Sequence, residues 1–187
     1  MLGIQRQTAT VVYARVFCLM STLTYAELFS QSNFSFLTGA SHPEELVAKA
    51  AELGYTALAM CDECSVAGVV RAHSYIKAQQ LPIKLIVGSY LCYEQLELVV
   101  LCPTKSAYSQ LCRVITNARR RCEKGQYQLS EWDLKTLKGC ILIWLVDGQN
   151  EGAKAEDEHW GPWLKRHYGE QLYIGVRREL NSFEPEQ

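Results

Sequence analysis

The residues best suited to chemistry in this 187-residue chain are polar side chains that follow its short apolar runs. Asp62 and Glu63 come directly after the run 57–61, and Asp147 comes after the run 140–146. Carboxylates at strand ends could hold a divalent metal ion and support hydrolysis, but a di- or trinuclear site also needs imidazole ligands. The four histidines stand elsewhere, as His42, His73, His159 and His167. None pairs with another at ligand spacing, which favours surface or packing roles.

Cys61 and Cys64 form a C-x-x-C pair, a spacing that can bind zinc or carry out redox chemistry. A structural zinc site needs a second pair of ligands, and no further C-x-x-C or H-x-x-x-H follows at a useful distance. A thioredoxin-like motif opens a helix after a strand, which this pair could do, yet a lone C-x-x-C is weak evidence. The eight cysteines are scattered, mostly in apolar runs. We therefore expect them to pack as small buried side chains in a reducing cytosol.

Apolar periodicity predicts the elements that would position these residues. Strands are expected at 25–28, 57–61, 83–87, 96–102, 140–146 and 172–176, and those at 57–61, 83–87 and 96–102 are expected to be buried. Helices are expected at 41–53, 66–79, 106–122 and 160–168, with a short one after Ser130. Ser41 and Glu44 have the spacing of a capping box, and the acidic stretch 147–158 is expected to be a solvated loop. Strands separated by helices imply βαβ units, and hence an α/β fold with a mainly parallel sheet or barrel surrounded by helices.

Composition sets limits on the class of protein. The chain is 48% hydrophobic and 21% charged, with 19 Lys and Arg against 20 Asp and Glu. A net charge of −1 excludes a histone-like DNA-binding protein and a disordered polyanion. No uncharged apolar stretch approaches the roughly 18 residues of a membrane span, so we expect no membrane partner.

The first 20 residues do not have the pattern of a signal peptide. Arg15 interrupts the apolar stretch that such a peptide needs, and the residues from Cys18 to Ser21 make a poor cleavage site. We interpret residues 1–20 as an extension ahead of a domain at 21–187, and we expect a cytoplasmic protein.

Four segments, in order, resemble one known family. They are YAELFSQSNFSFLTGASHPEEL (25–46), LGYTALAMCDEC (53–64), LIVGS (85–89) and LCRVITNARRR (111–121). Together they resemble the PHP (polymerase and histidinol phosphatase) domain that opens the alpha subunit of bacterial C-family DNA polymerases. Two features are most similar to the error-prone branch of this family. One is Asp-Glu-Cys, where many relatives have Asp-His, and the other is the Ala-Arg-Arg-Arg helix end. The resemblance implies a PHP-type (βα) barrel-like fold, incomplete in a truncated fragment of a polymerase for DNA replication and lesion-associated synthesis.

The resemblance also places a metal pocket in this sequence. The family's His-x-His positions fall at Phe29 and Gln31, its Asp-His pair at Asp62 and Glu63, and a Glu position at Tyr90. A phenyl ring cannot bind a metal, and an amide is a weak neutral ligand. Losing this many ligands implies a vestigial pocket in a chain without its own cofactor. Zinc or manganese would bind only if the pocket were functional after all, and magnesium would serve polymerase modules that lie downstream in the family.

Three hypotheses follow for the function. The first is a structural PHP segment that packs against the polymerase body, does not catalyse by itself, and meets DNA through the parent enzyme. The second is a stand-alone metal-dependent phosphoesterase. The third is an adaptor whose basic helix end, with Arg119, Arg120 and Arg121, binds DNA or a partner. The same positive charges also suit the negative end of a helix dipole, so a solvated helix end is the simpler interpretation.

Overall fold

The computed structural model describes residues 25–146 and 153–176, so the predicted extension 1–20 and Asp147 lie outside the described residues. The strands are β1 (Ala26–Ser30), β2 (Ala57–Met60), β3 (Lys84–Tyr93), β4 (Leu96–Leu101), β5 (Ile141–Val146) and β6 (Leu172–Val176). The helices are α1 (Pro43–Glu52), α2 (Ala67–Gln79), α3 (Lys105–Arg120), α4 (Glu131–Lys135) and α5 (Ala153–Tyr168), followed by the 3₁₀ turn η1 (Gly169–Gln171).

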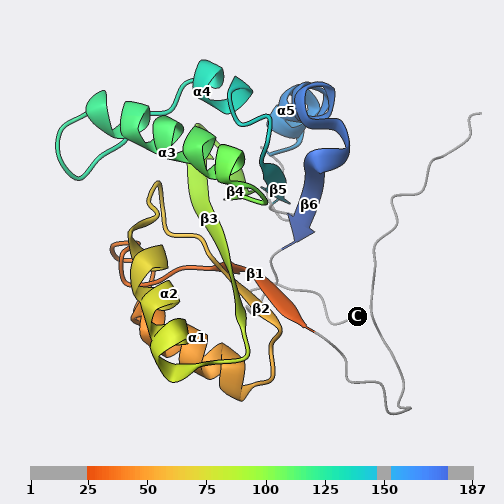
Figure 1. Ribbon diagram of the computed structural model, residues 1–187. Helices are drawn as coiled ribbons and strands as arrows, with labels where there is room; N and C mark the ends of the chain where they lie inside the picture. Colours follow the sequence, from red (N-terminus) through yellow and green to blue (C-terminus); the bar gives the residue numbers. More distant parts are fainter. Residues whose placement is uncertain (1–24, 147–152, 177–187) are drawn as a thin grey trace, which may run out of the picture.

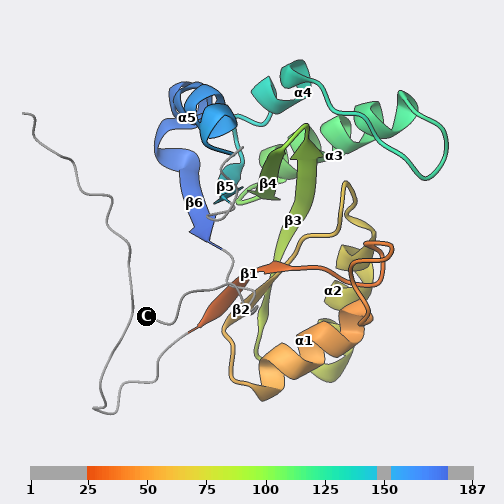
Figure 2. The ribbon, with the colours of Figure 1, turned by 180° about the vertical axis from the view of Figure 1, so that it is seen from behind.

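The six strands form one sheet in the order of the chain, with β1 and β6 at its two edges. β1, β2 and β3 are parallel, and so are β5 and β6, whereas β4 is antiparallel to both of its neighbours. The sheet curls into a half-barrel, and all the helices lie on its outer side (Figures 1 and 2). This arrangement confirms the predicted α/β fold with a mainly parallel sheet and external helices.

The β3–β4 hairpin is the main departure from the predicted strands. The apolar run was expected to end at Gly88, but β3 continues to Tyr93 and pairs with β4 from Gly88↔Leu101 to Tyr93↔Leu96. A Cβ atom on Gly88 would lie 2.7 Å from Sγ of Cys61 and 2.8 Å from the carbonyl oxygen of Val100. Glycine at this position therefore permits close packing inside the strand and does not end it.

Two further local predictions were wrong. Helix α5 begins at Ala153, so residues 153–158 are helical although their charge suggested a loop. Acidic residues are favourable in the first turns of a helix because their negative charge is attracted to the positive end of the helix dipole. The capping box of α1 is also shifted by one residue, since the backbone N–H of His42 donates to Oε2 of Glu45 at 2.7 Å.

Apolar side chains pack on both faces of the sheet. On the outer face, α1 and α2 cover one cluster around Val47, Leu58 and Met60, and α3, α4 and α5 cover a larger one around Leu98 and Leu142. These two clusters hold the helices against the strands, because each Å² of apolar surface that is buried stabilises the fold by about 25 cal/mol. A third cluster lies on the inner face of the sheet; its buried members are Ala59, Cys61, Val99, Leu101 and Leu145.

None of the helices that the structure describes is both long enough and apolar enough to cross a membrane. Seven cysteines lie in the described ranges, and all of them are free thiols. Three of the seven, Cys61, Cys64 and Cys140, are fully buried in the apolar clusters. For these three, the predicted role as small buried side chains is confirmed.

Candidate functional site

Asp62 is the centre of the candidate site. It lies two residues after the end of β2, and only 1% of its surface is exposed. Its Oδ1 accepts hydrogen bonds from the backbone N–H of Ser32 at 2.7 Å and from the Ser35 hydroxyl at 3.0 Å. The Ser32 hydroxyl lies 2.9 Å from each of the two carboxylate oxygens. A buried carboxylate needs such donors to offset its lost hydration, and these donors tie the β1–α1 loop to the end of β2.

Glu63, the neighbouring carboxylate, is held by residues from a different part of the chain. The Tyr127 hydroxyl donates to Oε1 of Glu63 at 2.9 Å, and burial, followed by this hydrogen bond, raises the pKa of Tyr127. The Arg119 guanidinium lies 5.3 Å from the centre of the Tyr127 ring. It also donates to the carbonyl oxygens of Glu63 at 3.1 Å and Cys64 at 3.2 Å. The loop after β2 is therefore fixed by α3 and by the segment that follows it.

The remaining pocket positions contribute aromatic rings. Phe29 at the end of β1 and Tyr90 in β3 lie with their ring centres 5.7 Å apart. Both rings pack against the apolar cluster on the inner face of the sheet. Gln31 is half-buried at the start of the loop that carries Ser32. The structure thus brings together Phe29 and Tyr90, and separately Asp62 and Ser32, at one end of the sheet.

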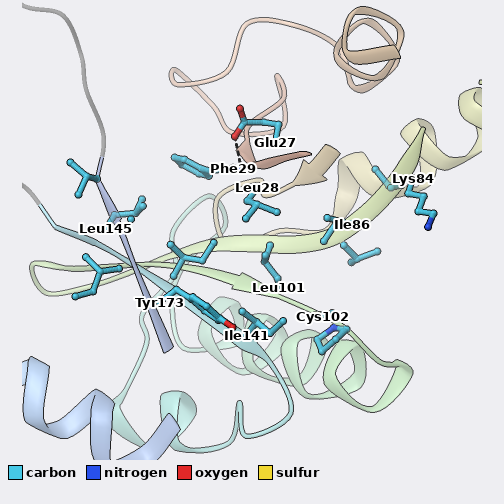
Figure 3. A pocket seen from close by; sticks show the side chains of 17 residues that line it. Glu27, Leu28, Phe29, Lys84, Ile86, Leu101, Cys102, Ile141, Leu145 and Tyr173 are labelled. Atoms are coloured by element: carbon cyan, nitrogen blue, oxygen red, sulfur yellow. Dashed lines mark hydrogen bonds between the residues drawn. The ribbon is translucent and has the colours of Figure 1, made fainter. Parts of the chain in front are cut away.

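The inner face of the half-barrel borders an apolar cavity of about 910 Å³ that is open to solvent. It extends from β1 past β3 and β5 to β6, and Figure 3 shows Phe29, Ile86, Leu101, Ile141 and Tyr173 around it. Most of its wall is aliphatic or aromatic, so it offers few ligands to a polar substrate.

The residue types at the pocket do not match a metal centre. In the part of the chain that the structure covers, no group of three or more His, Cys, Asp or Glu side chains lies close enough to hold a metal ion. His42, His73 and His159 are exposed side chains, and His167 stacks on Trp163 with ring centres 4.1 Å apart. The Asp62 carboxylate already accepts hydrogen bonds from two serines.

The C-x-x-C pair lies in two separate environments. Cys61 belongs to the inner apolar cluster, and Cys64 belongs to the outer cluster under α3. Burial raises the pKa of the Cys61 thiol, and burial raises that of Cys64 to about 11. Redox cysteines and zinc ligands act as thiolates, which a raised pKa disfavours. The geometry therefore favours a packing role for both residues.

The basic helix end is largely engaged within the protein. Arg119 binds the loop after β2 as described, and Arg121 forms an ion pair with Asp133, whose side chain is 3% exposed. Nη2 of Arg121 donates to Oδ1 of Asp133 at 3.1 Å, while Arg120 is exposed. Two of the three arginines thus stabilise loops around α3.

Sequence reasoning missed the distant residues that contact Asp62, Glu63 and Cys64. Three residues that are distant in sequence contact Glu63 in the loop after β2. Counted along the chain from Glu63, Ser35 is 28 residues away, Tyr127 is 64 and Arg119 is 56. Ser35 had one local signal, because it lies three residues after Ser32 in a turn where its N–H donates to the Ser32 carbonyl. Tyr127 has no such signal, since only the folded chain brings it next to Glu63.

Comparison with known proteins identifies the family. A model of the PHP domain matches residues 27–173, inside the predicted domain 21–187. The chain is 59% identical over 158 residues to the error-prone DNA polymerase of Vibrio vulnificus strain YJ016. It is 50% identical over 161 residues to the error-prone DNA polymerase of Methylococcus capsulatus. Each match covers 84% of this chain and 15% of the relative, so the chain spans about 15% of the length of these polymerases.

Solved structures share the fold at low sequence identity. A protein from Bifidobacterium adolescentis, assigned as a metal-dependent phosphoesterase, aligns with a TM-score of 0.50 and 11% identity over 82% of this chain and 86% of its own. An amidohydrolase from Chromobacterium violaceum aligns with a TM-score of 0.52 and 14% identity over 81% and 75% of the two chains. The family match and these shared folds agree with the half-barrel architecture. The chain therefore belongs to the PHP domain family and is homologous to the N-terminal region of error-prone DNA polymerases.

Proposed function

We propose that this chain serves as a structural PHP module of an error-prone DNA polymerase, and that its metal pocket is degenerate. The observation that carries the proposal is the state of Asp62, a buried carboxylate whose oxygens accept from Ser32 and Ser35. A metal ion would compete with these donors for the same lone pairs. At the Phe29 position, where the family has a histidine, the phenyl ring supplies no ligand.

In this proposal the Asp62 carboxylate stabilises the loop in place of a metal ion. Charge-assisted hydrogen bonds from Ser32 and Ser35 hold the end of β2 against the β1–α1 loop. Arg119 and Tyr127 fix the next two residues, Glu63 and Cys64. The chain's role is then to support the polymerase body of the same family, in the cytoplasm. Nucleotidyl transfer for DNA replication or repair, with its magnesium ions, belongs to other parts of the longer relatives.

The first test measures metal binding and phosphoesterase activity together. The purified chain is dialysed against Zn²⁺ or Mn²⁺, and bound metal is counted by mass spectrometry alongside hydrolysis of p-nitrophenyl phosphate. We expect less than stoichiometric metal and no metal-dependent hydrolysis. Glu63→Gln is the matched variant and should behave identically. A different result would establish the stand-alone phosphoesterase: the wild type binds stoichiometric metal and shows metal-dependent hydrolysis, and Glu63→Gln loses the bound metal.

The second test addresses the polymerase. The region of the Vibrio vulnificus error-prone DNA polymerase that matches this chain is replaced by residues 25–176. The chimera should fold and extend a primer at a rate close to that of the parent enzyme, because the two regions are 59% identical in sequence. A soluble, folded chimera that does not synthesise DNA would contradict the proposed structural role.

A further inference from the structure

Cys102 and Cys140 face each other across β4 and β5. The antiparallel register of these strands runs from Glu97↔Leu145 to Leu101↔Ile141, so Cys102 and Cys140 are the next opposing pair. The backbone N–H of Cys102 donates to the Val87 carbonyl at 2.9 Å, on the side of β3. Its backbone polar groups thus point away from Cys140, which makes the two cysteines a non-hydrogen-bonded pair.

This kind of pair has the spacing that a disulfide requires. Opposing residues in non-hydrogen-bonded positions have Cα atoms about 4.5 Å apart. Disulfides join residues whose Cα atoms are between about 4.4 and 6.8 Å apart. Both side chains point to the same face of the sheet, since the outer apolar cluster contains Cys140 and has Cys102 packed against it.

The two thiols influence each other's ionisation. The side chain of Cys140, followed by burial, raises the pKa of Cys102, and the side chain of Cys102 lowers the pKa of Cys140. The Cys140 thiol itself donates to the Ala107 carbonyl oxygen at 3.6 Å. Cys140 is fully buried, while Cys102 is partly exposed. A small oxidant can therefore approach the pair from the side of Cys102.

We propose that Cys102 and Cys140 form a reversible disulfide when the protein meets a hydroperoxide. The sulfur of Cys140, the thiol of the pair whose pKa is lowered, attacks a peroxide oxygen, the O–O bond breaks, and the thiol proton leaves with the hydroxide as water. The resulting sulfenic acid is attacked by the second sulfur, the S–O bond breaks, and a second water forms. The thiols together lose two electrons and two protons, and one hydrogen peroxide is reduced to two waters.

The bridge would close a loop that contains α3 and α4. Cross-linking residues so far apart in sequence restricts the unfolded chain, so the oxidised protein should be more stable than the reduced one. The disulfide would thus lock the half-barrel between β4 and β5 under oxidising conditions and release it on reduction.

The test uses the full chain, reduced, freed of reductant and treated with hydrogen peroxide. Peptide mapping after alkylation should find the Cys102 and Cys140 peptides joined, with a higher melting temperature that dithiothreitol reverses. Cys102→Ser and Cys140→Ala should each lack both effects, and Cys112→Ser, which removes a nearby thiol on α3, should retain them. Two free thiols at positions 102 and 140 after peroxide treatment, or a bridge to another cysteine, would overturn the proposal. If Cys140→Ala does not fold, Cys102→Ser decides the matter alone.

Discussion

The Tyr127 hydroxyl donates a 2.9 Å hydrogen bond to Oε1 of Glu63, which joins residues 64 positions apart. The same hydroxyl accepts from the backbone N–H of Cys92 at 3.3 Å. One phenol therefore links the loop after β2 to β3 and to the segment beyond α3. This contact and those of Asp62 hold the loop after β2 in place.

Replacing Tyr127 by Phe should destabilise the protein measurably. The variant keeps the ring and its contact with Arg119, but it leaves the Cys92 N–H and the Glu63 carboxylate without the hydroxyl. We expect the free energy of unfolding to fall by about 1.5 kcal/mol. Urea unfolding followed by tryptophan fluorescence measures this change. In the Glu63→Gln background the effect of Tyr127→Phe should shrink, and an unchanged effect would show that the pair is not coupled.

The sequence was sufficient to predict the order of the strands and helices, but not the contacts of the residues at the candidate site. Continuous apolar runs reveal buried strands because both faces of such strands are covered, and this located β2 and most of β4. The apolar runs also located β5 and β6, although β6 is an edge strand with exposed side chains. The β3–β4 hairpin was missed because Gly88 has the same sequence signal whether it ends a strand or permits close packing. The contacts of Asp62 with Ser35, and of Glu63 with Tyr127, depend on tertiary structure and leave no periodic trace.

The stability of the protein should fall at alkaline pH through Cys64. Burial raises the pKa of this thiol to about 11, whereas an unfolded cysteine ionises near pH ~8.5. A group with a raised pKa contributes stability that is complete below its unfolded pKa and lost as the pH rises through its folded pKa. The free energy of unfolding should therefore decline between about pH 8.5 and 11.

The variant Cys64→Ala isolates this contribution. The free energy of unfolding of each protein is measured in reducing buffer and compared with the value of the same protein at pH 7. Across the same pH range, this free energy should fall less for Cys64→Ala than for the wild-type protein. Cys61, whose pKa is also raised by burial, accounts for part of the remaining slope. Cys122→Ala serves as the control for removal of a partly exposed thiol. Identical pH profiles for Cys64→Ala and the wild type would contradict the assignment.

Gly68 should not tolerate a side chain, because α2 begins directly over the Asp62 carboxylate. A Cβ atom on Gly68 would lie 2.5 Å from Oδ2 of Asp62 and 3.1 Å from the Ser32 hydroxyl. Asp62 cannot move away without losing its hydrogen bonds to the β1–α1 loop. Gly68→Ala should therefore cost about 2 kcal/mol in spite of the higher helix propensity of alanine. Ser74→Ala, at an exposed position of the same helix, should be neutral or slightly stabilising in the same urea titration.

Arg121 and Arg120 should differ in their effect on acid stability. Burial opposes ionisation of Asp133, but hydrogen bonds from Arg121 and Ser130 outweigh it, and the pKa of Asp133 lies below its ordinary value. A lowered carboxyl pKa contributes stability that is present above the unfolded pKa of about 4 and is lost as the pH falls through the folded pKa. Arg121→Ala should lower the urea concentration at the midpoint of unfolding at pH 7. Below about pH 4, this midpoint should also fall less steeply with decreasing pH in the variant than in the wild type. Arg120→Ala, one residue away and exposed, should match the wild type at every pH. Equal losses in the two variants would mean that general positive charge at the end of α3, and not the ion pair with Asp133, stabilises this part of the fold.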